Sequence, residues 1–176
     1  MTSMSPQLHH VDADQLAPSS DFRTALLSLP GASVIHLEGS DRLRTRAVVT
    51  LLHSNEPSGF KAIYRIIREG VVPSTNVAII VASIDAAQTG PLLYHHHLQT
   101  EADLNRCFTP PFDTPQRQLA AAILQYLRSL EPEVVIDTHN TSSHSEPFCV
   151  TADHTPETRL WSTLFSPRLV VLTHVA

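Results

Sequence analysis

Two histidines and a glutamate, each at or near the end of an apolar segment, are the residues of this 176-residue chain best suited to chemistry. His53 and Glu56 follow the apolar run 47–52, and His139 follows the run 133–137. Both runs are typical of buried β-strands, so their ends deliver these side chains to loops at one edge of a sheet. Two imidazoles and a carboxylate are the ligand set of catalytic zinc sites that keep a fourth position open for water. The sequence therefore predicts one zinc ion per chain, bound by His53, Glu56 and His139.

Two of the acidic residues in these segments also have a simpler interpretation. Glu56 precedes Pro57, a favoured first residue of a helix, and its carboxylate could merely stabilise the positive end of that helix. Asp137 lies two residues before His139 and on the same side of the strand. It is either the carboxylate that orients a ligating imidazole or a hydrogen-bond acceptor for the following turn.

A candidate substrate-binding pair lies in the long polar segment 85–107, which lacks periodicity and has the length of a functional loop. Asn105 and Arg106 are adjacent there. A guanidinium pairs with a carboxylate through two parallel hydrogen bonds, and an asparagine adds another, so the pair predicts a substrate that carries a carboxylate. The alternative is a surface ion pair of Arg106 with Asp103 or Glu101.

Composition narrows the class of protein. The hydrophobic fraction of 42% and the charged fraction of 16% are typical of a globular protein of one domain. The net charge of −5, without a basic cluster, excludes a nucleic-acid partner. Residues 1–20 form a polar N-terminal segment without a signal peptide, and no run is long enough for a membrane span. Together with only two cysteines, Cys107 and Cys149, these features predict a cytoplasmic protein. The histidines at 95–97 are explained by a solvated loop.

Strand and helix patterns alternate along residues 21–176, which we expect to form the catalytic domain. Helices are predicted from Pro57 to Gly70, from Thr114 to Leu130 and from Thr155 onward. Strands are predicted at residues 34–37, 47–52, 76–84, 133–137, 148–151 and 169–172. This order predicts an α/β fold with three αβα layers and a mixed, mostly parallel central sheet. In such sheets ligands bind beyond the carboxyl ends of the strands, where His53 and His139 fall.

Three short segments resemble the signatures of a known family. They are residues 53–57 (HSNEP), 103–108 (DLNRCF) and 137–141 (DTHNT). In this order and at these separations they resemble the succinylglutamate desuccinylase/aspartoacylase family, a branch of the zinc carboxypeptidase-like hydrolases. The similarity covers about residues 45–150.

The resemblance implies a function and a role for each residue. It implies that His53, Glu56 and His139 bind zinc and that Asn105 and Arg106 hold the substrate's carboxylate. Members of the family hydrolyse the amide bond of an N-acylated acidic amino acid, so the expected substrate is a small N-acyl amino acid. The acyl group and the amino acid are not identified by these motifs.

The chain departs from the family pattern at several positions. Family members usually have glycines around the first motif, where this chain has Leu51 and Ser54, and Ser54 requires a backbone that avoids positive φ. The family's carbonyl-polarising arginine would fall near Leu98, where this chain has none, and His96 or His97 is the nearest replacement.

The family's general base is a glutamate well downstream of the third zinc ligand. Only Glu146 and Glu157 follow His139 here, and the motif supports neither, so the catalytic base stays unassigned. The family's C-terminal β domain is also missing, which predicts an N-terminal portion of the fold with an exposed sheet edge and self-association. The alternatives to a hydrolase are a degenerate relative that binds zinc without catalysis and an α/β module without a metal.

Overall fold

The first unit of the protein is built on a mixed sheet. The computed structural model describes residues 7–172 and divides into two compact units at the boundary between Asn140 and Thr141. The sheet of the first unit has the order β1-β2-β4-β3-β5. Its strands are β1 (His9–Asp12), β2 (Ser33–Leu37), β3 (Asp41–Thr50), β4 (Thr75–Val81) and β5 (Val135–Thr138). Only the β2–β4 pair is antiparallel, so the predicted α/β class with a mixed, mostly parallel sheet is confirmed.

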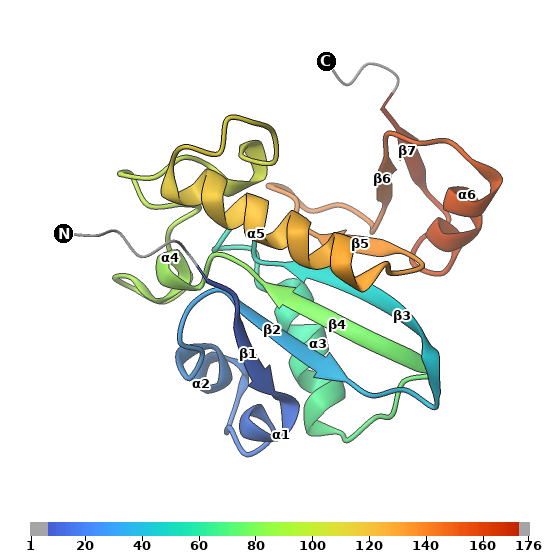
Figure 1. Cartoon of the computed structure of the whole chain (residues 1–176), viewed down its shortest axis with the longest axis horizontal. Coiled ribbons are helices and arrows are strands. Elements are labelled where there is room, and N and C mark those ends of the chain that lie inside the picture. Colours follow the sequence, from blue (N-terminus) through green and yellow to red (C-terminus); the bar gives the residue numbers. More distant parts are fainter. Residues whose placement is uncertain (1–6, 173–176) are drawn as a thin grey trace. The chain divides into compact units, whose positions relative to one another are not determined.

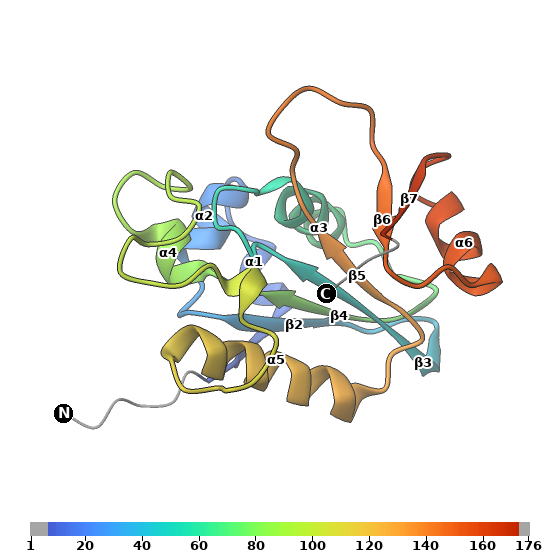
Figure 2. The same cartoon turned by 90° about the horizontal axis from the view of Figure 1, so that it is seen from above.

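Helices cover both faces of this sheet (Figures 1 and 2). The helical segments are α1 (Ala13–Leu16), α2 (Phe22–Leu27), α3 (Ser58–Arg68), α4 (Ile84–Gln88), the 3₁₀ turn η1 (Leu104–Arg106) and α5 (Pro115–Leu130). One core lies between the sheet and α1, α2 and α3, and a second lies between the sheet and α5. The first unit therefore has three layers. Among residues 7–172, no helix is long and apolar enough to cross a membrane.

Helix α3 shows how the sequence pattern determines packing. Its apolar residues recur at the i, i+3, i+4, i+7 spacing of one helical face. All four of them, Phe60, Ile63, Tyr64 and Ile67, are buried in the first core. Gly70, two positions after the last helical residue, has φ +63°, a conformation that glycine adopts without steric cost. The predicted helix and its end are confirmed.

Other predicted elements are confirmed with changed limits. The predicted strand 76–84 ends at Val81, because Ile84 begins the short helix α4. The segment 85–107 is not wholly irregular, since it contains most of α4 and the turn η1. The polar N-terminal segment contributes β1 and α1, which the sequence patterns did not predict, and α2 follows them. Helix α5 begins as predicted, with the Thr114 hydroxyl accepting a hydrogen bond from the Arg117 N–H.

The second unit is a small strand–helix–strand arrangement. It contains β6 (Cys149–Thr151), α6 (Pro156–Thr163) and β7 (Leu169–Val171), and the two strands pair in parallel. The Thr155 side chain accepts a hydrogen bond from the Thr158 N–H, and Pro156 occupies the first turn of α6. These elements match the strands and the helix predicted from the sequence.

Candidate metal centre

The predicted zinc ligands lie together at one edge of the first unit's sheet. Strands β3 and β5 are parallel neighbours in which Thr50 pairs with Thr138, so both chains leave the sheet at the same edge. His53 Nδ1 lies 3.0 Å from the Glu56 carboxylate, and His139 Nδ1 lies 2.9 Å from its other oxygen. The two Nδ1 atoms are 3.2 Å apart. Three side chains from distant parts of the sequence therefore present their donor atoms to one small space.

These separations can be compared with those of a zinc site. Zinc binds imidazole nitrogen and carboxylate oxygen at about 2.0–2.2 Å, so neighbouring ligand atoms around a tetrahedral ion lie roughly 3.3 Å apart. The separations of 2.9, 3.0 and 3.2 Å are slightly shorter than this value. The side chains of His53 and Glu56 are only 12% and 14% exposed, and that of His139 is 31% exposed. The donor set and its spacing fit zinc, with one side open to solvent.

Each histidine of this cluster is backed by an aspartate. His139 Nε2 lies 2.8 Å from Asp137 Oδ2, and His53 Nε2 lies 3.3 Å from Asp103 Oδ1. A carboxylate on one ring nitrogen makes that nitrogen the N–H donor and leaves the other nitrogen with a lone pair for a metal. Both Nδ1 atoms are therefore oriented as metal ligands. The position of Asp137 therefore fits a carboxylate that orients a ligating imidazole, rather than an acceptor for the following turn.

Asp103 is the functional residue that sequence reasoning missed. It was considered only as an ion-pair partner for Arg106, whereas its carboxylate contacts His53 and accepts a hydrogen bond from the Asn105 N–H. The signal was present, because Asp103 is an acidic residue within the second family-like segment. No spacing rule connects it with His53, since the two residues come from different loops.

Glu56 does not cap helix α3. That helix has no side-chain cap, and the Glu56 carboxylate instead accepts a hydrogen bond from the Asn140 N–H at 2.9 Å. Burial raises the pKa of Glu56, but the Asn140 N–H, the His139 side chain and the positive charges that the two imidazoles can carry outweigh this effect. The net pKa lies below the ordinary value, so the carboxylate is ionised at neutral pH, as a metal ligand must be.

In the absence of a metal ion, the same surroundings favour a proton on His139. The hydrogen bond to Asp137 is the largest influence, burial opposes it, and Glu56 adds to it, which together raise the pKa of His139 to about 8. A proton and a metal ion therefore compete for this imidazole near neutral pH.

His96 lies over the metal cluster. Its ring stacks on that of His53, with centroids 3.9 Å apart and planes inclined by 26°, and its Nδ1 lies 3.1 Å from Asn55 Oδ1. His53, His96 and Asp103 also lie close enough to hold an ion. However, the nitrogen lone pairs of stacked rings run side by side rather than toward a common point. His53, Glu56 and His139 are therefore better placed to hold an ion than the second group, and the ring of His96 covers one side of His53.

Asn105 and Arg106 belong to the turn η1, directly after Asp103. Arg106 is exposed, and among residues 7–172 it has no ion-pair partner. The alternative partners are otherwise engaged, because Asp103 contacts His53 and Glu101 is hydrogen-bonded to Gln116. The guanidinium is therefore available to a ligand at the turn that also supports the cluster.

The first loop accommodates residues where the family usually has glycine. Ser54 is fully buried, its backbone avoids positive φ as required, and its N–H donates to the carbonyl of His96. Leu51 is also fully buried but has φ +56°, a conformation that disfavours residues with a Cβ atom. The Ser83 hydroxyl donates to the carbonyl of Leu52 and fixes this loop against the end of β4.

Helix α3 approaches the strands closely beside the metal cluster. A Cβ atom at Gly59 would lie 2.1 Å from Thr138 Oγ1 and 2.7 Å from Thr50 Oγ1. Only glycine permits this approach. The Ser58 N–H, at the start of the same helix, donates to Asn140 Oδ1 at 3.4 Å. The start of α3 is therefore packed against Thr138 and Asn140, the residues on either side of His139.

The remaining glutamates considered from the sequence belong to the second unit. Glu146 is exposed in the segment before β6, and Glu157 lies in the first turn of α6. Neither glutamate is assigned as the general base.

Compared with protein-family models, with curated proteins and with solved structures, the chain matches none of them.

Proposed function

We propose that this protein is a zinc-dependent hydrolase that cleaves the amide bond of a small N-acyl amino acid, with a zinc carboxypeptidase-like fold. The observation that carries the proposal is the convergence of His53, Glu56 and His139, with an aspartate behind each imidazole. This arrangement satisfies both the ligand set and the supporting hydrogen bonds that catalytic zinc sites require. The motif resemblance to the succinylglutamate desuccinylase/aspartoacylase family supports the same reaction.

The roles of the protein's residues follow from their contacts. Zinc held there would lower the pKa of a water molecule and polarise the scissile carbonyl group. In the neutral form of each imidazole, Asp103 and Asp137 hold the N–H on Nε2, which leaves Nδ1 of His53 and His139 as the ligating nitrogen. The ring of His96 stacks on that of His53 and covers one side of the cluster.

Substrate recognition is assigned to the turn η1. Arg106 is exposed and without an ion-pair partner among the described residues, and Asn105 lies beside it. An anionic substrate would pair its carboxylate with this guanidinium. Because Asp103 starts the same turn and contacts His53, substrate binding and metal support share one short segment.

A second candidate is zinc binding without catalysis. Its support is the lack of an assigned general base and of the family's arginine near Leu98. Loss of a general base costs about 10²- to 10⁴-fold in rate, which would leave the metal site intact but the turnover small.

The test is hydrolysis of N-acetylaspartate and N-succinylglutamate by the zinc-loaded chain, measured as release of the free amino acid. We expect turnover that disappears in His139→Ala and falls strongly in Arg106→Ala, with His154→Ala as a matched control. One zinc per chain with no turnover above the His139→Ala variant selects the second candidate. No zinc after metal loading excludes both.

A further inference from the structure

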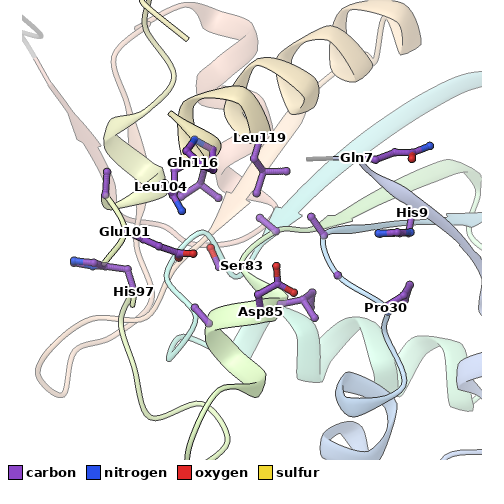
Figure 3. Close-up of a pocket in the computed structure, with 17 residues that line it drawn as sticks. Gln7, His9, Pro30, Ser83, Asp85, His97, Glu101, Leu104, Gln116 and Leu119 are labelled. Atoms are coloured by element: carbon purple, nitrogen blue, oxygen red, sulfur yellow. The ribbon is translucent and has the colours of Figure 1, made fainter. Parts of the chain in front are cut away.

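A cavity of about 210 Å³ lies at the sheet edge of the first unit, and Figure 3 shows the residues that line it. The beginning of β1, the end of β4, helix α4 and the start of α5 surround it. None of His53, Glu56 and His139 lines it. Since one water molecule occupies about 30 Å³ in the liquid, the space corresponds to roughly seven waters. It admits a small organic ligand that the proposed hydrolase function does not use.

The charges of the cavity lining favour a cation. Asp85 and Glu101 line the cavity together with the imidazoles of His9 and His97, whereas no lysine or arginine from the described residues 7–172 does. Burial, followed by the negative charge of Asp85, raises the pKa of Glu101, although Gln116 and His97 act in the opposite direction. A positive charge beside the two carboxylates would relieve their repulsion.

The composition of the lining favours an organic cation over a metal ion. In the described part of the chain, no group of three or more His, Cys, Asp or Glu side chains close enough to hold a metal includes Asp85 or Glu101. Much of the remaining lining is apolar and comes from Ile84, Leu104 and Leu119. A wall of aliphatic side chains beside carboxylates matches a short hydrocarbon chain with a charged nitrogen at its end.

We infer that this cavity is a second ligand site, which binds a small aliphatic ammonium compound through Asp85 and Glu101. The ammonium group donates hydrogen bonds to the carboxylates, and the hydrocarbon part lies against Ile84, Leu104 and Leu119. The close approach of the surrounding chain supports a shaped site. Gly31 has φ +151°, and a Cβ atom there would lie 3.3 Å from the His9 ring and 3.8 Å from Asp85 Oδ1.

The test is a titration of the ¹⁵N-labelled full chain by NMR in the presence of a chelator, so that zinc plays no part. Butylammonium, butyrate and butanol share one carbon chain and differ in charge. We expect butylammonium to bind with a Kd on the order of millimolar, as its few atoms allow, and to shift the amides of Ser83, Ile84 and Leu104. Butyrate and butanol should bind at least tenfold more weakly.

Substitutions that keep the size of the side chain test the roles of Asp85 and Glu101. Asp85→Asn and Glu101→Gln should each weaken butylammonium binding about tenfold or more, whereas Asp14→Asn, a matched loss of charge in α1, should leave it unchanged. Equal binding of butyrate, shifts confined to residues outside the cavity, or undiminished affinity in both cavity variants would overturn the inference. Because the ligand series uses the unaltered chain, a variant that fails to fold does not decide the outcome.

Discussion

The Nδ1 atoms of His53 and His139 lie 3.2 Å apart, although 86 positions separate the two residues in the chain. The other nitrogen of each ring faces an aspartate, which leaves both Nδ1 atoms with lone pairs. Two lone pairs and the Glu56 carboxylate repel one another in so small a space unless a cation or protons lie among them. The cluster is therefore suited to hold either a proton on His139, as in the metal-free protein, or a cation.

The aspartates behind the histidines should determine metal affinity. Asp103→Asn and Asp137→Asn keep the shape of the side chain but remove the negative charge that holds the N–H on Nε2 of the neighbouring imidazole. We expect each change to lower zinc affinity about 10- to 100-fold, measured by competition with a fluorescent chelator. Asp14→Asn serves as the control. Unchanged affinity in both variants would show that these contacts do not orient the ligands.

Zinc binding should depend on pH through His139. Because zinc binds the neutral imidazole and the pKa of His139 is about 8, protons compete increasingly as the pH falls below that value. We expect zinc affinity to fall about tenfold for each pH unit between pH 7.5 and 6, and to level off above pH 8. A flat profile over this range would argue against His139 as a ligand.

The metal-free protein should show the opposite pH dependence of stability. The raised pKa of His139 means that the folded protein binds a proton at this residue more tightly than the unfolded chain does, in which the pKa of His139 is near the ordinary 6.5. This stabilisation is fully present below pH 6.5 and is lost as the pH rises through about 8. We expect Tm, measured with a chelator present, to fall across this window, and the fall to be smaller in His139→Gln. An equal fall in that variant would assign the effect to other groups.

At position 51, a glycine variant should be more stable than an alanine variant, which reverses the usual order. Replacing its buried side chain destabilises the protein in either case, but at φ +56° glycine avoids a strain of about 1–2 kcal/mol that alanine retains. We therefore expect Leu51→Gly to be more stable than Leu51→Ala by urea denaturation. Leu52 is also buried and lacks a positive φ, so Leu52→Gly should be less stable than Leu52→Ala. The same order at both positions would contradict the backbone conformation described.

Gly59→Ala should destabilise the protein although alanine is the better helix former. The added Cβ atom would lie 2.1 Å from Thr138 Oγ1, so α3 must move away from the strands. We expect a loss of about 1–3 kcal/mol in the free energy of unfolding, together with weaker zinc binding. Ser58→Ala, at an exposed neighbouring position, should have little effect. Gly59→Ala with greater stability would show that the helix is not packed as described.

The sequence predicted the parts of the fold that depend on local periodicity. The stripe of α3 and the apolar runs of β3 and β4 correspond directly to burial, so these elements were found. Strand β1 was missed because its residues, His9–Asp12, are polar and lie at the edge of the sheet, where side chains stay exposed. Such a strand is specified by pairing with β2, which no local pattern shows.

The candidate site was predictable where ligands follow strands and unpredictable where they do not. Because His53 and His139 come at the ends of neighbouring parallel strands, sheet topology alone brings them together. Asp103 and His96 reach the cluster from the segment between α4 and α5, whose course depends on tertiary contacts. The cavity beside Asp85 and Glu101 was missed for the same reason, since its walls come from five separate stretches of chain.

The most direct test of the metal centre is zinc analysis combined with X-ray absorption spectroscopy of the loaded chain. We expect one zinc per chain after dialysis, with nitrogen and oxygen neighbours at about 2.0–2.2 Å that include two imidazoles. In His53→Ala and His139→Ala the zinc should be lost, whereas His154→Ala should retain it. A chain that binds no zinc, or one that keeps it unchanged in both cluster variants, would contradict the assignment of His53, Glu56 and His139.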